Sequence, residues 1–133
     1  MPLDLDFART LLAGYHADGG RFGHRQHLHA ALSFLRRYGP EDGAAAMLGF
    51  IRHVAEHEGA PEKVNETVTE FWVRAVRCAD APGGEPAGFE ELLAGHPQLL
   101  DKDLPLRHWT RERLGSAQAR QGWVEPDLAP LPF

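Results

Sequence analysis

The chain contains very little cysteine, no long apolar run and no concentrated positive charge. Cys78 is the only cysteine in 133 residues, so neither an internal disulfide nor a zinc site built from several cysteines can form. Its place in a helical pattern favours a buried, inert thiol over a nucleophile. No apolar run approaches the ~18–20 residues that cross a bilayer, and the acidic start "MPLDLDFART" is unlike a signal peptide. These features predict a cytoplasmic protein that does not act in the membrane.

The charge balance argues against nucleic acid as a partner. The chain has 14 Lys and Arg against 19 Asp and Glu, a formal charge of -5 with histidine neutral. Arg36-Arg37 is the only adjacent basic pair, whereas phosphate binding needs a concentrated basic face. Apolar residues make up 43% and charged residues 25%, which is typical of a globular chain. The length predicts one domain over residues 1–133.

Apolar spacing predicts an all-α fold. Residues at the 3-and-4 spacing of amphipathic helices indicate four main helices, at 4–17, 24–38, 41–58 and 62–79, which form a bundle core within residues 1–80. A Gly/Pro-rich loop follows at 80–88, and residues 81–133 are expected to pack on the core. This part is predicted to contain short helices at 89–94 and 110–120 and an extended, proline-rich tail after Glu125.

Three of the eight histidines lie within "HRQHLH" at 24–29, where the second helix begins. His24 and His27 each precede an apolar core position by four residues, so helical phase predicts that both point into the bundle. His29 aligns with polar residues and is predicted to face solvent. The spacing HxxH places two imidazoles on one face, where they could share a metal ion or a substrate. A structural role for both is the alternative.

The fourth helix supplies polar residues that could complete such a site. In "VNETVTEFW", Asn65 and Thr69 lie on the shoulder of the buried stripe, and buried polar groups need hydrogen-bond partners. The inward histidines could be those partners. Alternatively, Asn65 caps the helix and Thr69 bonds to its own backbone. Glu66 falls on the opposite face and is a metal ligand only if the helix begins later or is rotated from this phase, and His108 is the best distant candidate for the site.

Three segments resemble a family of small helical bacterial proteins of unassigned function. They are "HRQHL" at 24–28, "NETVTEFW" at 65–72 and "RERLGSAQARQGWVEPDLAPLPF" at 111–133, which match the family's HxxHL, (H/N)ET(I/V)T and PDLxPLP segments in order. The resemblance implies one site formed by six residues: His24, His27, Asn65, Thr69, Ser116 and Arg120.

The chain departs from the family pattern at two places. Asn65 stands where many relatives have histidine, and Trp109-Thr110 stands where the ending commonly reads Tyr-Ser. Asn65 would weaken a three-histidine centre, because an amide is a poor ligand for zinc.

The first hypothesis is a small enzyme that acts on a small molecule between the second and fourth helices. Without a metal, His27 or His24 would be the general acid or base, while Asn65 and Thr69 orient it or polarise the substrate. With a metal, His24 and His27 would bind one divalent ion (zinc, iron, copper or nickel), and Asn65, Glu66 or His108 would be the third ligand. The metal version is favoured because histidine is costly to bury without a role.

Further residues would bind the substrate. Arg120 would hold an anionic group, and Ser116, Trp72 and His108 complete the expected substrate-binding set. No nucleotide cofactor is indicated. Two other hypotheses stay open: a non-catalytic module that binds a small ligand in the same pocket, and a structural or partner protein with packing histidines. A homodimer is compatible with all three.

Overall fold

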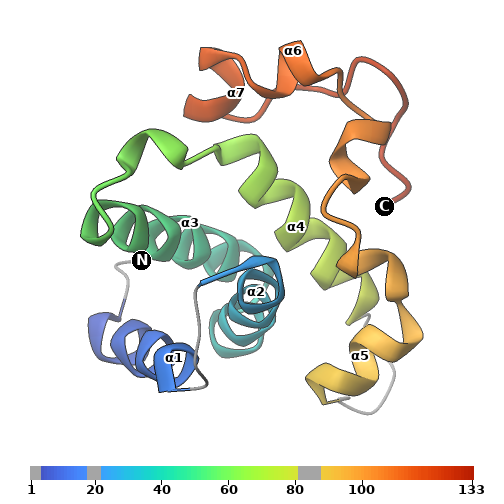
Figure 1. Ribbon diagram of the computed structural model, residues 1–133. Coiled ribbons are helices and arrows are strands. Elements are labelled where there is room, and N and C mark those ends of the chain that lie inside the picture. The colour runs from blue at the N-terminus through green and yellow to red at the C-terminus, as the bar shows by residue number, and fades with distance from the viewer. Residues whose placement is uncertain (1–3, 18–21, 81–87) are drawn as a thin grey trace.

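The protein is built from helices. The computed structural model in Figure 1 describes residues 4–17, 22–80 and 88–133. Its main helices are α1 (Leu5–Ala17), α2 (His24–Tyr38), α3 (Pro40–His57) and α4 (Glu66–Ala79). These residues contain no strand, so the predicted all-α class is confirmed. No helix within the described ranges is both long and apolar enough to cross a membrane.

The remaining elements are short. They are the 3-10 turns η1 (Pro61–Lys63), η2 (Pro97–Leu100) and η3 (Leu104–Arg107) and the helices α5 (Phe89–Gly95), α6 (Arg111–Leu114) and α7 (Ala117–Gln121). The prediction of one helix over 110–120 is wrong, because the side chains of Thr110 and Ser116 cap two separate helices. The last residues contain no helix, as predicted. Most of the predicted loop at 80–88 lies outside the described residues.

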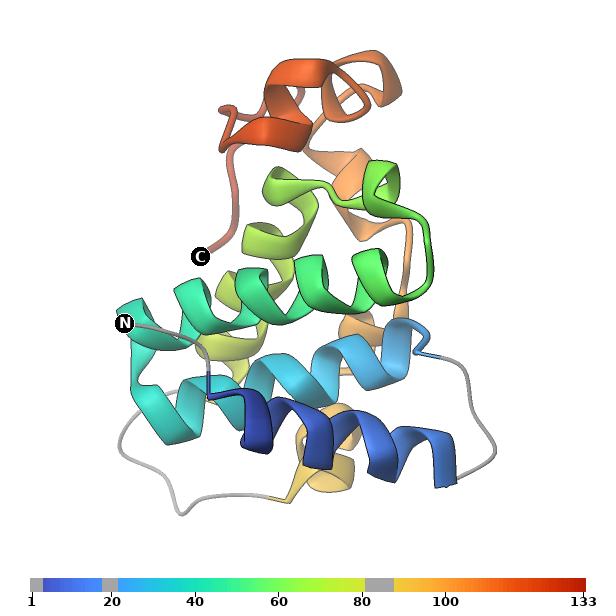
Figure 2. The same cartoon turned by 90° about the vertical axis from the view of Figure 1, so that its left-hand side faces the viewer.

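Three helices, α2, α3 and α4, form the centre of the core. Figure 2 shows α2 and α3 side by side and running in opposite directions. Gly39, with φ of 89°, makes the turn between them, a left-handed conformation that glycine adopts without strain. A Cβ at Gly43 would lie 2.8 Å from the Cα of Leu35, so the two helix backbones approach very closely there. The fully buried side chains include Leu28, Phe34, Met47, Phe50, Phe71 and Val76.

The C-terminal segment is anchored to α4 by buried polar contacts. The hydroxyl of Thr67, which is fully buried, donates to the carbonyl of Gly122 at 2.8 Å and accepts from the amide of Val124 at 3.2 Å. The indole of Trp109, also fully buried, donates to the carbonyl of Val124 at 3.0 Å. Figure 1 shows α6 and α7 beyond the start of α4. These contacts fix the segment that follows α5 on the core.

Two sequence predictions about α4 are wrong. Cys78 is exposed near the end of α4, because the buried stripe of that helix passes through Ala75 and Val76 instead. The fourth helix begins at Glu66 and not at residue 62, because Asn65 caps it and η1 forms a separate turn before it. The later start does not make Glu66 face His27: its carboxylate pairs with Arg52 of α3 at 3.2 Å.

Candidate functional site

A cavity of about 280 Å³ lies where α2, α3 and the start of α4 meet. His27, Asn65 and Thr69, three of the residues predicted to form a site, line it together. Most of the wall is apolar and comes from Phe22, Ile51, Val54, Val64 and Val68, while Glu58 and Lys63 add one charge of each sign. These three residues therefore line one cavity, between the second and fourth helices where the sequence predicts a site.

His27 is the chemically unusual residue of this cavity. Although the residue as a whole is only partly buried, its Nε2 is buried and has no hydrogen-bond partner among the described residues. Burial lowers the pKa of His27 from 6.5 to about 4, and the charge of His24 adds to the effect. The imidazole is therefore neutral at physiological pH, and an unpartnered buried polar atom of this kind costs ~1–3 kcal/mol.

His24 does not line this cavity. Its Nε2 donates to the carbonyl of Leu99 at 2.7 Å, and its ring meets the edge of Trp72 with 4.5 Å between centroids. Trp72 is 2% exposed and is a core residue that packs on Phe71 as well. Both histidines thus point inward, as helical phase predicts, but they contact different surroundings, and His24 bridges α2 to η2.

Asn65 uses both ends of its amide to hold the start of α4. Its Oδ1 accepts from the amide of Val68 at 3.1 Å, and its Nδ2 donates to the carbonyl of Leu114 at 2.7 Å. Of the two alternatives for this residue, capping is therefore the one that the structure shows. Thr69, one turn further, is 4% exposed and contributes to the cavity wall.

The other predicted site residues lie outside this cavity. Arg120 donates to the carbonyls of Glu62 at 2.8 Å and Gly115 at 3.2 Å. Ser116 caps α7 by accepting from the amide of Ala119. The Nδ1 of His108 lies 3.2 Å from the carbonyl of Ala129, which ties η3 to the tail. These contacts give Arg120, Ser116 and His108 structural roles in the C-terminal segment.

A metal centre stays a prediction. Within residues 4–17, 22–80 and 88–133, no three His, Cys, Asp or Glu side chains gather closely enough to hold an ion. The Nε2 of His24 is engaged by the Leu99 carbonyl, so His24 could bind a metal through that atom only by giving up this bond.

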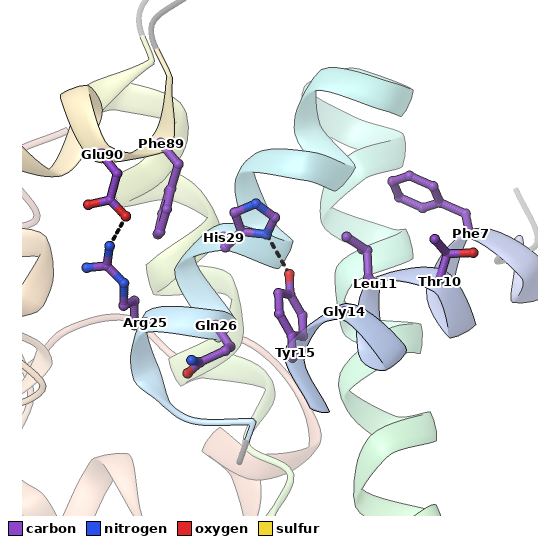
Figure 3. Close-up of a pocket in the computed structure, with 10 residues that line it drawn as sticks. All are labelled: Phe7, Thr10, Leu11, Gly14, Tyr15, Arg25, Gln26, His29, Phe89 and Glu90. Carbon is purple, nitrogen blue, oxygen red and sulfur yellow. Dashed lines mark hydrogen bonds and ion pairs between the residues drawn. The ribbon is translucent and has the colours of Figure 1, made fainter. Parts of the chain in front are cut away.

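A second cavity contains His29, which helical phase assigned wrongly. It measures about 350 Å³ and lies between α1, α2 and α5 (Figure 3). His29 was predicted to face solvent, but it is partly buried there and its Nδ1 lies 2.7 Å from the hydroxyl of Tyr15. The prediction is wrong because α1 and α5 cover this face of α2. A tyrosine and a histidine that are 14 positions apart leave no local signal in the sequence.

Comparisons with protein-family models, with curated proteins and with solved structures find no match to the chain. The family resemblance of the three segments therefore stays a prediction.

Proposed function

We propose that the protein binds a small, mainly apolar molecule in the cavity between α2, α3 and α4, and that His27 orients it through one hydrogen bond. The observation that carries the proposal is the buried Nε2 of His27, which has no partner among the described residues. A ligand that supplies a partner recovers part of the free energy that this atom costs. Perturbed titratable groups in apolar pockets are typical of functional sites.

The cavity sets the size and character of the ligand. Its volume of about 280 Å³ accommodates on the order of ten non-hydrogen atoms, since one water occupies ~30 Å³ in the liquid. Phe22, Ile51 and Val68 favour an apolar body. Nε2 of His27 is buried, so the imidazole ring must rotate about χ2 before this nitrogen can face the ligand. Such a rotation is feasible because χ2 of histidine has broad energy minima. The ligand class is therefore a small alcohol, phenol or heterocycle with one hydrogen-bonding group.

Protein-observed NMR with methyl labelling tests this proposal. A panel of phenols and small heterocycles is titrated into the full chain, and the methyl signals of Ile51 and Val68 are followed. We expect saturable shifts for some compounds with Kd below about 1 mM. Replacing His27→Leu should weaken these compounds about fivefold or more, because it removes the polar contact and keeps the apolar wall. The absence of any saturable shift at both methyls would refute the proposal, and the methyl signals of Leu11 report separately on the other cavity.

Catalysis at the same cavity is the second candidate. A neutral imidazole can accept a proton, which favours His27 as a general base. Its lowered pKa makes it a weak base, so a substrate would have to stabilise the protonated form on binding. His27→Ala separates the candidates: in an enzyme it abolishes turnover and leaves substrate binding largely intact, whereas in a binding protein it changes affinity alone.

A further inference from the structure

The cavity between α1, α2 and α5 has a hydrogen-bonded pair at its centre. Figure 3 shows the hydroxyl of Tyr15 directed at one ring nitrogen of His29, and the two atoms are 2.7 Å apart. The rings also meet edge to face, with centroids 5.5 Å apart. Tyr15 comes from α1 and is 8% exposed, while His29 comes from α2 and is partly buried. The pair therefore fixes both side chains in one arrangement.

Burial determines where the protons of this pair lie. It raises the pKa of Tyr15, and it lowers the pKa of His29, to which the charge of Arg25 also contributes. Both side chains are neutral near pH 7. A phenol is a stronger acid than a neutral imidazole N–H, so the Tyr15 hydroxyl donates to Nδ1 and the ring hydrogen of His29 lies on Nε2. Figure 3 shows this second nitrogen on the side of the ring away from Tyr15.

The rest of the cavity combines a cation with apolar walls. Arg25 lies beside Glu90, with which it forms an ion pair, and its guanidinium is 5.3 Å from the centre of the Phe89 ring. The apolar walls come from Phe7, Leu11 and Phe89. The five donors of a guanidinium allow Arg25 to keep Glu90 and still bind a second carboxylate. The cavity thus combines two N–H donor groups, the carboxylate of Glu90 and apolar walls.

We propose that this cavity is a second binding site, separate from that of His27, and that it takes small aromatic carboxylates. The ring of the ligand lies between Leu11 and Phe89, and its carboxylate accepts from Nε2–H of His29 and from the guanidinium of Arg25. The volume of about 350 Å³ leaves room for a single substituted ring. Glu90 offsets much of the charge of Arg25, so affinity is modest, with Kd of about 0.1–1 mM.

Protein-observed NMR tests this proposal through the methyl signals of Leu11. Three probes of similar shape are titrated into the full chain: sodium benzoate, benzamide and benzylammonium. Benzoate should give saturable shifts and bind about tenfold more tightly than benzylammonium, whose charge is reversed. Arg25→Gln should weaken benzoate about tenfold and remove its preference over benzamide. Tyr15→Phe should weaken it about threefold or more, because the hydrogen of His29 is no longer held on Nε2.

Two results at this cavity would overturn the inference, and the control variant provides a third. One is the absence of a saturable shift at Leu11 with benzoate up to about 10 mM. The other is equal benzoate affinity in the native protein and in Arg25→Gln, whose exposed side chain can be replaced without disturbing the core. His27→Leu is the matched control and should leave benzoate affinity unchanged. Loss of benzoate binding in this control would also refute a separate site. Failure of the His27 cavity to bind ligands would not affect the proposal for the cavity at His29.

Discussion

The buried imidazole of His27 should make the stability of the protein depend on pH. Its pKa is lowered from 6.5 to about 4 in the folded protein, so the unfolded chain takes up a proton at a higher pH than the folded protein does. A lowered pKa of a base gives stability that is fully present above pH 6.5 and is lost as the pH falls toward 4. Acid should therefore destabilise the protein through this residue.

The magnitude follows from the two pKa values. Between about pH 7.5 and about pH 5 the unfolded chain gains almost one proton at His27 and the folded protein gains almost none, so the free energy of unfolding falls by about 2 kcal/mol through this group. The full difference, reached below about pH 4, is about 3 kcal/mol. Either value is a large fraction of the stability of a domain of this size.

Urea unfolding followed by circular dichroism measures the effect. Native protein and His27→Leu are unfolded at both pH values, and the variant should lose about 2 kcal/mol less than the native protein between them. His57→Gln, which removes an exposed histidine from the end of α3, is the control and should behave as the native protein does. If His27→Leu and native protein lose stability equally, within about 0.5 kcal/mol, the reasoning fails.

Substitutions at Thr67 and Gly43 test the packing of the core. Thr67→Val should destabilise the protein by about 1–3 kcal/mol in the same unfolding assay, because the carbonyl of Gly122 loses its buried donor. Thr67→Ser keeps the hydroxyl and should keep most of the stability. Equal stability of the two variants would contradict this explanation. Gly43→Ala should lower the free energy of unfolding by roughly 1–3 kcal/mol, because the new Cβ would meet the backbone of Leu35. Gly14→Ala is the control and should not destabilise the protein, because its Cβ meets nothing within 4 Å. Unchanged stability of Gly43→Ala would refute the close approach of α2 and α3.

The elements of the fold follow from local sequence more closely than the sites do. Apolar spacing predicts the main helices because the buried stripe repeats within each helix, and Gly39 and Pro40 mark the turn between α2 and α3. Apolar spacing predicts a start of α4 at residue 62, which is too early, although the sequence also offers Asn65 as its cap. The second bond of Asn65, to the Leu114 carbonyl 49 residues later, could not be predicted. The periodicity of apolar residues within one helix cannot predict a contact over that separation in sequence.

The residues of the candidate site were likewise predictable only where local helical spacing determines their position. Helical phase places His27 at the interior, and that is where the cavity lies. It assigns His29 to solvent because a single stripe defines only one buried face, whereas α2 is covered by α1 and α5 on a further side. Thr67 was missed for a similar reason, since its hydroxyl is satisfied only by the distant Gly122 and Val124. The sequence could single out polar residues such as Asn65 and His24, but it could not predict their contacts with distant elements.

Asn65 both caps α4 and bonds to Leu114, and this second contact bears on the order in which the chain folds. The α2–α3 pair joins neighbours in the chain and needs little loop closure, so it is the natural early unit of folding. The segment before α4 is different, because its contacts are distant in sequence. Asn65 donates to the carbonyl of Leu114, 49 residues later, and the carbonyl of Glu62 accepts from Arg120, 58 residues later. Ordering so long a loop costs entropy before any contact forms. We therefore expect the start of α4 to become fully ordered late in folding, when α6 and α7 pack against it.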